Sequence, residues 1–320
     1  MHATLRLLVG LGLLLGAGCV AAPGAAEEPW RRSAAMPTPR SELAVAALDG
    51  RLYVAGGIGR FGTTATFEVY DPAADSWREL APLPVGLHHL GMAAADGRLY
   101  ISGGYDDITF TPDSARAWVY DPMTARWSAI ADMPGPRAAH RMAALDGRLY
   151  VVGGVGAEPQ ALWRYDPADD AWTSLALLPT RREHLAVAVA GGKLYALGGR
   201  WEDVGNLAIV EAYDPADDSW TRQPDMPMAR GGFAASALAS RIHVTGGEQL
   251  DSGDTFATHD AFDLATGSWE TLPAMPTARH GIDAAAVAGQ WYVIGGGTGA
   301  GARTFFTLTD AVEIYTPPQR

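Results

Sequence analysis

Histidine, arginine and glutamate side chains recur at corresponding places along this sequence. Counting nine residues back from each of six regularly spaced turn positions gives Arg40, Leu87, Arg137, Arg182, Arg230 and Arg279, so arginine fills five of the six places. Five of the eight histidines and two glutamates follow within three residues. We therefore take as candidate ligand-binding residues Arg40, Glu42, His88, His89, Arg137, His140, Arg182, Glu183, His184, Arg230, Arg279 and His280.

Two kinds of chemistry suit this set. A guanidinium forks onto carboxylates, so a polar ring of these side chains could bind an anionic or hydroxyl-rich ligand. Imidazoles converging beside Glu42 or Glu183 could instead ligate zinc or a similar ion. No HxH or HxxxH pair fixes two ligands locally, so we predict neither a metal nor a cofactor. A structural alternative stays open, in which the arginines pair with neighbouring repeats or loop carbonyls.

His184 and Glu183 are the candidates for acid–base catalysis, because an imidazole and a carboxylate can hold and release a proton near neutral pH. The sequence contains nothing that resembles a nucleophile–base pair or a defined metal motif. It therefore favours binding over catalysis and leaves enzymatic activity as an alternative.

Two further aromatic residues, Tyr105 and Trp201, stand beside carboxylates and outside the repeated aromatic positions. An exposed ring next to carboxylates is suited to stacking on a sugar face while its hydroxyls are hydrogen-bonded. We add both residues to the candidate ligand-binding set. In the alternative interpretation each ring folds back onto the body of the protein.

The elements that must position these residues form an internal repeat of 45 to 50 residues. Glycine doublets mark it at Gly56-Gly57, Gly103-Gly104, Gly153-Gly154, Gly198-Gly199, Gly246-Gly247 and Gly295-Gly296. Tryptophans recur with the same steps at Trp30, Trp77, Trp127, Trp172, Trp220 and Trp269. We expect the repeated tryptophans and tyrosines to be core residues.

Each repeat reads as four short strands, which in the first repeat are 41–48, 51–55, 66–70 and 76–80. Asp-Gly and Gly-Gly pairs between the first two strands favour two-residue hairpin turns, because these residues tolerate a positive φ. Tyr-Asp-Pro ends the third strand in four repeats. A four-stranded meander cannot bury both faces alone, so stacking the repeats around an axis predicts a β-propeller.

The aliphatic-Gly-Gly motif, Tyr-Asp-Pro, the Trp 18 to 23 residues after the doublet and a final Met-Pro-x-x-Arg resemble the kelch repeat. Six copies cover nearly everything from Trp30 to Thr316. The resemblance implies an all-β, six-bladed propeller of residues 27–320 with four antiparallel strands per blade. It also implies closure by an N-terminal strand at Trp30 that completes the last blade.

Two kinds of kelch enzyme can be compared with these residues. Copper radical oxidases of the galactose oxidase type need a Cys cross-linked to a Tyr, and no Cys follows Cys19, so that chemistry is excluded. Sialic acid mutarotases are exported bacterial kelch propellers of similar size and blade number. Because no catalytic signature of theirs matches specific positions here, a mutarotase or epimerase-like isomerase is the alternative to a binding module.

The N-terminal 26 residues resemble a signal peptide, with Arg6 followed by an apolar stretch too short to span a membrane and then small residues. Cys19 sits where a bacterial lipoprotein is acylated, although Gly16 replaces the usual aliphatic residue; cleavage after Ala22 or Ala26 is the alternative. We expect an exported protein that is periplasmic, anchored to the cell envelope by lipid, or secreted.

The net charge of −12, from 24 basic and 36 acidic side chains, disfavours binding to nucleic acid or to anionic membranes. We expect a monomer without a transmembrane helix. The sequence thus predicts an exported kelch propeller that binds a protein or carbohydrate partner through the loop face around its central channel.

Overall fold

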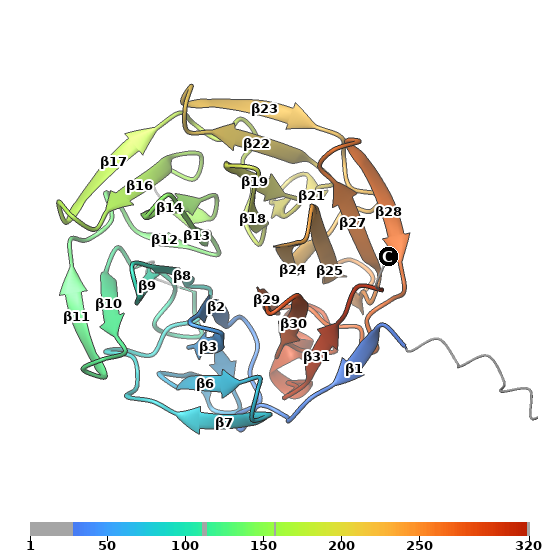
Figure 1. The fold of residues 1–320 in the computed structure, drawn as a ribbon, viewed down its shortest axis with the longest axis horizontal. Coiled ribbons are helices and arrows are strands. Elements are labelled where there is room, and N and C mark those ends of the chain that lie inside the picture. Colours follow the sequence, from blue (N-terminus) through green and yellow to red (C-terminus); the bar gives the residue numbers. More distant parts are fainter. Residues whose placement is uncertain (1–27, 111–113, 157, 319–320) are drawn as a thin grey trace, which may run out of the picture.

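Six four-stranded antiparallel sheets are arranged in a ring in the computed structural model, which describes residues 28–110, 114–156 and 158–318 (Figure 1). The expected six-bladed, all-β propeller is therefore confirmed. The expectations for residues 1–26, including the signal peptide and Cys19, lie outside the described residues. Among these residues, no helix is both long and apolar enough to cross a bilayer.

The blades follow one another along the chain, and each places its first strand nearest the axis. Blade 1 contains β2 (Ala44–Leu48), β3 (Arg51–Ala55), β6 (Phe67–Asp71) and β7 (Ser76–Glu79). Blade 2 contains β8 (Gly91–Ala95), β9 (Arg98–Ser102), β10 (Ala117–Asp121) and β11 (Arg126–Ile130). Blade 3 contains β13 (Arg141–Leu145), β14 (Arg148–Val152), β16 (Leu162–Asp166) and β17 (Ala171–Leu175).

The second half of the ring repeats this order. Blade 4 contains β18 (Ala186–Ala190), β19 (Lys193–Leu197), β22 (Val210–Asp214) and β23 (Ser219–Gln223). Blade 5 contains β24 (Gly231–Leu238), β25 (Arg241–Gln249), β27 (His259–Asp263) and β28 (Ser268–Leu272). Blade 6 contains β29 (Asp283–Val287), β30 (Gln290–Ile294), β31 (Val312–Tyr315) and, from the other end of the chain, β1 (Trp30–Arg32).

Short elements lie in the connections between the blades' strands. They are β4 (Ile58–Gly59), β5 (Gly62–Thr63), β12 (Arg137–Ala138), β15 (Val155–Gly156), β20 (Arg200–Trp201), β21 (Gly205–Asn206), β26 (Asp254–Thr255) and the 3-10 helix η1 (Gly301–Phe306). The strand β26 pairs with β25, and the other six strands form three separate two-stranded sheets.

The two-residue turns adopt the backbone conformation that their sequence predicts. Asp49 and Gly50 have φ of 49° and 74°, and Asp96 and Gly97 have φ of 49° and 72°. Positive φ at both central positions is the requirement of a type I′ turn, whose twist matches that of the paired strands. These turns set the register of the first two strands in their blades.

The repeated tryptophans hold neighbouring blades together. Each indole Nε1 donates a hydrogen bond of 2.8 to 3.2 Å to a carbonyl oxygen of the preceding blade: Trp77 to Ala34, Trp127 to Ala81, Trp172 to Ala131, Trp220 to Ala176, Trp269 to Pro224 and Trp30 to Pro273. Because a large ring and its polar N–H are both satisfied there, these residues are structural, as expected.

The N-terminal strand β1 lies in blade 6 beside β31 (Figure 1). Trp30 is opposite Tyr315 and Arg32 is opposite Glu313 in an antiparallel register. The Trp30 indole makes the same interblade hydrogen bond as the other five repeated tryptophans, across 243 positions of the chain.

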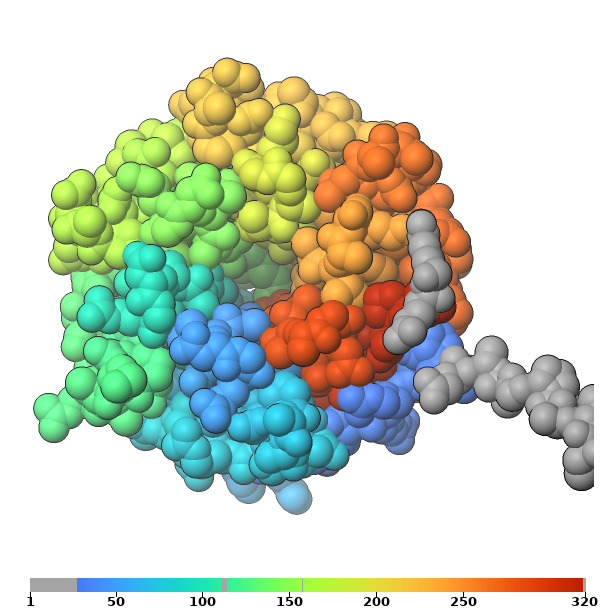
Figure 2. Space-filling model, in the orientation of Figure 1, coloured from blue at the N-terminus to red at the C-terminus, as the bar shows by residue number. Residues whose placement is uncertain are grey.

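The buried apolar side chains lie between blades. Among the described residues they form six clusters, each of which joins two adjacent blades; Phe67 and Leu99, for example, meet between blades 1 and 2. The centre of the ring is instead hollowed, as Figure 2 shows. The propeller is therefore held by contacts between blades, which leaves its axis available for polar residues.

Candidate functional site

One face of the propeller brings together two kinds of segment, and we call it the loop face. The segments that lead into the first strands form single antiparallel bridges with the residues that follow the glycine doublets: Ser41 with Ile58, His88 with Tyr105, Glu183 with Arg200 and His280 with Gly297. Residues far apart in a repeat are therefore adjacent on this face, and most of the candidate residues lie there.

A closed ring of backbone hydrogen bonds surrounds the axis at this face. Its members, which we call the axial ring, are Glu42, His89, Ala139, His184, Gly232 and Gly281, one from each blade. Each N–H donates to the carbonyl oxygen of the member in the preceding blade, at 2.8 to 3.0 Å. The six positions are thus equivalent in their backbone contacts and differ only in their side chains.

All six members of the axial ring have a left-handed backbone. Their φ values are 53°, 56°, 52°, 50°, 67° and 61° in chain order. Glycine adopts this conformation freely, as Gly232 and Gly281 do, whereas other residues are strained in it by about 1–2 kcal/mol. Long polar side chains at three strained positions point to a function that offsets this cost.

These three side chains meet near the axis. Glu42 Oε2 lies 3.3 Å from His89 Nε2 and 4.0 Å from His184 Nε2, and the two Nε2 atoms lie 2.9 Å apart. We call Glu42, His89 and His184 the axial triad. Their ligand atoms all lie within 4.8 Å of one another, an arrangement that could hold a metal ion.

Charged residues surround the triad. Arg200 donates from Nε to Glu183 Oε1 at 2.7 Å and also contacts Glu248. Glu183 in turn contacts His184 Nδ1. His280 lies between two carboxylates, with Nδ1 at 3.1 Å from Glu248 Oε2 and 3.7 Å from Glu42 Oε1.

Burial sets the protonation of these groups. It lowers the pKa of His89 and of His184 well below the usual value, with the charges of Arg200 and other cations acting in the same direction. Burial likewise raises the pKa of Glu42. Burial alone would lower the pKa of His280, but the hydrogen bond and charge of Glu248 outweigh it and raise that pKa.

The contact with His280 also favours the ionised form of Glu248. Its burial acts to raise the pKa, yet the hydrogen bond and charge of His280, with Arg200 and the Gly301 N–H, lower it to about 2. His280 and Glu248 thus favour each other's charged forms at 3.1 Å, beside two imidazoles whose pKa values burial lowers.

An aromatic cluster flanks the triad on one side. His88 donates toward the Asp107 carbonyl oxygen at 2.7 Å, and its ring packs 5.4 Å from Tyr105 and 5.1 Å from Phe110. Tyr105 is buried, so its ring covers the histidines and is not the exposed sugar-stacking surface that we expected. Trp201 is partly exposed in β20, opposite Gly205.

The five repeated arginines do not line the channel, which corrects the expectation of an arginine ring. All five are fully buried. Their guanidinium groups enter the blades and pair with third-strand carboxylates in four cases: Arg40 with Glu68, Arg182 with Glu211, Arg230 with Asp260 and Arg279 with Glu313. Arg137 donates to the Gly153 and Ala161 carbonyl oxygens and lies 4.0 Å from the Trp163 ring.

His140 is buried between blades 2 and 3, where its Nε2 lies 3.1 Å from Ser102 Oγ. Burial lowers its pKa to about 3. It borders a small cavity of about 10 Å³ whose lining also includes the axial triad and Arg141. This volume is close to that of a single bound water.

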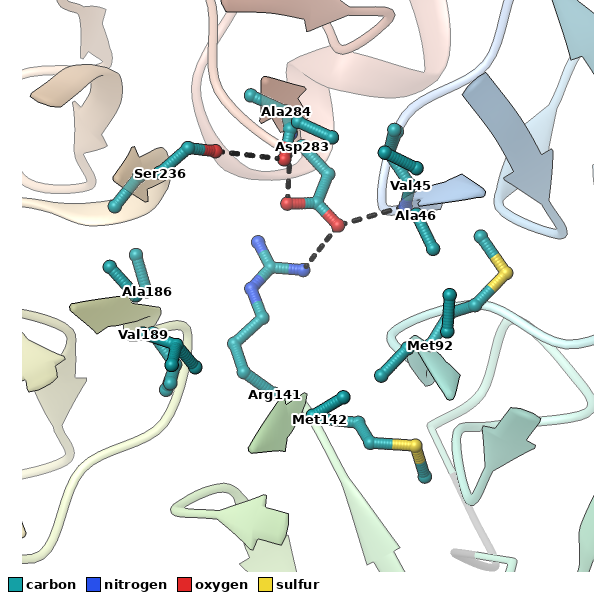
Figure 3. A pocket seen from close by; sticks show the side chains of 18 of the residues that line it. Val45, Ala46, Met92, Arg141, Met142, Ala186, Val189, Ser236, Asp283 and Ala284 are labelled. Carbon is teal, nitrogen blue, oxygen red and sulfur yellow. Dashed lines mark hydrogen bonds and ion pairs between the residues drawn. The ribbon is translucent and has the colours of Figure 1, made fainter. Parts of the chain in front are cut away.

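Below this cavity the channel contains a charged pair that the sequence analysis missed. Arg141 reaches from β13 toward Asp283 of β29, with Nη1 3.7 Å from Oδ2, and the Val45 N–H also donates to that carboxylate (Figure 3). Burial raises the pKa of Asp283. The remaining channel, a cavity of about 460 Å³, is lined mostly by alanines of the first strands.

A sequence signal for these missed residues exists. Arg141 and Asp283 occupy the first-strand position that holds Ala44, Gly91, Ala186 and Ala234 in the other blades. Arg200 and Glu248 occupy the position directly after the glycine doublet. At both positions a charged residue replaces the small or apolar residues of the other repeats. That difference between repeats could have identified these four residues from the sequence.

The loop face also carries most of the exposed apolar side chains. Of eight large ones among the described residues, six lie in the loops between second and third strands: Phe61, Ile108, Phe110, Val204, Leu250 and Phe306. They come from five blades. Phe61 and Phe306 are 97% and 91% exposed and border a groove of about 730 Å³, whereas Met123 lies in a turn at the opposite face.

Comparisons with known proteins agree with this architecture. A family model described as Attractin/LZTR1 beta-propeller matches residues 99–304, more than half of the chain. A second, described as KLHDC2/KLHL20/DRC7 Kelch-repeats domain, matches residues 26–154. The solved structure of YjhT superposes with a TM-score of 0.77 at 18% identity, over 89% of this chain and 97% of that one. No curated protein matches the sequence.

Proposed function

The chain belongs to the kelch-repeat β-propeller family, and we propose that it is an exported interaction module that binds a protein partner through its loop face. The observation that carries this proposal is the gathering of exposed apolar side chains there. Monomeric proteins rarely expose contiguous apolar patches unless these surfaces bind something. Phe61 and Phe306 border one groove, and the other four side chains lie in the corresponding loops of three further blades, so one partner could contact several blades.

The groove between Phe61 and Phe306 is the best anchor point on this face. Its lining comes from Thr38 and Pro39, from the loop 59–64 of blade 1, and from Phe305, Phe306 and Leu308 of blade 6. Two almost fully exposed aromatic rings that border a groove suit the large apolar anchors typical of protein interfaces. Arg60 and Arg303 stand in the same two loops and would contribute a polar rim.

A site-specific crosslinking experiment tests this proposal. A photoreactive phenylalanine analogue at Phe61 or Phe306 should crosslink to one protein in the native host, and the same analogue at Met123, 92% exposed on the opposite face, should not. With that partner purified, Phe61→Ser combined with Phe306→Ser should weaken binding by about 2 kcal/mol or more. Equal crosslinking from both faces, or unchanged affinity, contradicts the proposal.

A second candidate function, an isomerase acting on a carbohydrate, is favoured by the contact of Glu183 with His184. Both side chains are partly accessible, at 16% and 11% exposure, and Arg200 holds the carboxylate in place. A neutral imidazole backed by a carboxylate is an arrangement that can move a proton. In this case an anomer-exchange assay on sialic acids and other sugars should show turnover that Glu183→Gln abolishes while the melting temperature stays unchanged.

Export is part of the proposal, and intact-mass spectrometry of the mature protein in its native host tests it. A chain that begins at an acylated Cys19 would identify a lipoprotein, and cleavage after Ala22 or Ala26 would identify a protein without a lipid anchor. An unprocessed N-terminus would contradict export.

A further inference from the structure

The hydrogen bonds around His89 determine which of its ring nitrogens carries the proton. His88 Nε2 lies 2.7 Å from the Asp107 carbonyl oxygen, which can only accept, so His88 donates from that atom. The other nitrogen of a neutral His88 is then an acceptor, and His89 Nδ1, 2.5 Å away, donates to it. The Nε2 atom of His89 is left with its lone pair.

The contacts of His184 indicate its proton position in the same way. Its Nδ1 contacts the Glu183 carboxylate, whose other oxygen accepts a hydrogen bond from Arg200 Nε at 2.7 Å. A carboxylate oxygen accepts, so this contact is favourable only if His184 carries its proton on Nδ1. In that tautomer its Nε2 atom also keeps a lone pair.

Three acceptors consequently face one another. The lone pairs of His89 Nε2 and His184 Nε2 are 2.9 Å apart, and Glu42 Oε2 lies 3.3 and 4.0 Å from them. Neither imidazole has a proton to place between these atoms, and such an arrangement is unfavourable where water is largely excluded. We infer that the axial triad binds a divalent transition-metal ion, of which Zn²⁺ is the best fit.

The separations suit such an ion. A point equidistant from three atoms that are 2.9, 3.3 and 4.0 Å apart lies about 2.0 Å from each, which agrees with the usual zinc distances of about 2.0–2.2 Å. Two histidines and one glutamate leave a fourth position for water. The cavity of about 10 Å³ that the triad lines could hold it.

The surroundings also resemble those of metal-binding histidines. Such histidines commonly donate their other ring nitrogen to a carboxylate or a carbonyl, which orients the ring; Glu183 holds His184 directly, and the Asp107 carbonyl holds His89 through His88.

Zinc titration of the purified, chelator-treated protein by calorimetry tests this inference. We expect one Zn²⁺ per chain, and Co²⁺ in its place should give the visible absorption of a low-coordinate nitrogen and oxygen site. His89→Gly and His184→Gly should each weaken binding at least about 100-fold. Both variants should fold, because glycine already occupies the same ring position at Gly232 and Gly281.

Two further variants refine the test. Arg200→Gln should weaken binding by roughly 10- to 100-fold, the usual loss when the support of a ligand is removed. The matched control Glu202→Gln, at an exposed position near Arg200, should leave affinity unchanged. Absence of Zn²⁺ binding, or wild-type affinity in both glycine variants, would overturn the inference, the latter by placing the ion elsewhere in the chain. Neither result depends on the loop-face partner.

Discussion

Two histidine pairs in this propeller have the same nitrogen–nitrogen separation, but only one of them has a proton available for a hydrogen bond between its two nitrogens. In the axial pair, His89 Nε2 and His184 Nε2 lie 2.9 Å apart. In blade 5, His243 Nδ1 and His259 Nε2 also lie 2.9 Å apart. In the second pair the hydrogen-bonding groups satisfy one another without a ligand. Proximity alone therefore does not make a histidine pair a binding site.

The blade 5 pair is satisfied by its own protons. His259 Nδ1 lies 3.3 Å from the Pro273 carbonyl oxygen and donates to it, which leaves its Nε2 to accept from His243 Nδ1. Trp30 and Tyr315 pack against His259 at ring separations of 5.3 and 4.6 Å. This pair is part of the core between blades 5 and 6, whereas the axial pair lacks a proton at the point where it meets Glu42.

The largest expected effect comes from removing residues 27–36, which deletes the strand β1 that covers the blade 5 pair. The deletion removes Trp30 together with its contacts to blades 5 and 6, and loss of one buried tryptophan costs about 3–5 kcal/mol. We expect a large fall in melting temperature by calorimetry and exposure of His259. A truncated protein that melts with the full chain would contradict ring closure by β1.

Two arginines of blade 4 allow the same comparison between a structural contact and the loop-face cluster. Arg182→Ala leaves Glu211 buried without its partner, and breaking such a buried pair costs about 3–5 kcal/mol. Arg200→Ala removes a side chain that is 16% exposed and leaves Glu248 paired with His280, so it should cost much less in chemical denaturation. Equal destabilisation by the two variants would mean that the loop-face cluster is as structural as the buried arginines.

Protonation of the blade 5 pair in acid should destabilise the folded protein. Burial lowers the pKa of His243 to about 4 and of His259 to about 3, below the value of about 6.5 expected in the unfolded chain. The unfolded state therefore binds more protons between pH 6.5 and 4, and stability falls as the pH decreases through this window, by up to about 1.4 kcal/mol per unit for each histidine.

Replacing this pair provides the control. His243→Tyr with His259→Val introduces residues found at the same positions in blade 4, Tyr195 and Val210. Denaturation curves between pH 6.5 and 4 should become flatter in this variant. A slope identical to that of the wild type would show that other groups cause the acid sensitivity.

The smallest effect is expected at the axial ring. In the metal-free protein, His184→Gly should change the free energy of unfolding by less than about 1 kcal/mol, because relief of left-handed strain offsets lost packing. His259→Gly, in contrast, removes a fully buried side chain from β27 and should cost several kcal/mol. A large loss in His184→Gly would argue that the axial ring is there for stability.

The sequence predicted the fold well because the turns and strands of each repeat are specified by residues close together in the chain. Asp49-Gly50 specifies a turn, and the spacing of Trp77 from Gly57 specifies the outer strands, without reference to distant residues. The directions in which side chains point could not be predicted in this way. Arg40 and Glu42 are two residues apart, yet one enters the blade toward Glu68 and the other approaches the axis, since a left-handed φ of 53° at Glu42 reorients the chain.

The histidine cluster was anticipated in its location but not in its chemistry. That His89 and His184 meet depends on the sixfold closure of the axial ring, which brings blades 2 and 4 together across the axis. Their proton positions depend on Asp107 and Glu183, whose roles only a three-dimensional arrangement reveals. The same holds for Arg141 and Asp283, which lie in different blades and meet inside the channel.

The central claim is that two lone pairs face each other in the axial pair, and nitrogen-15 NMR of the histidine rings tests it most directly. In the metal-free protein at neutral pH, His89 and His184 should both carry their proton on Nδ1, and Zn²⁺ should then shift the two Nε2 resonances. His243 and His259, with protons on Nδ1 and no response to Zn²⁺, provide the internal reference. A proton on Nε2 of His89 or His184 would contradict the account.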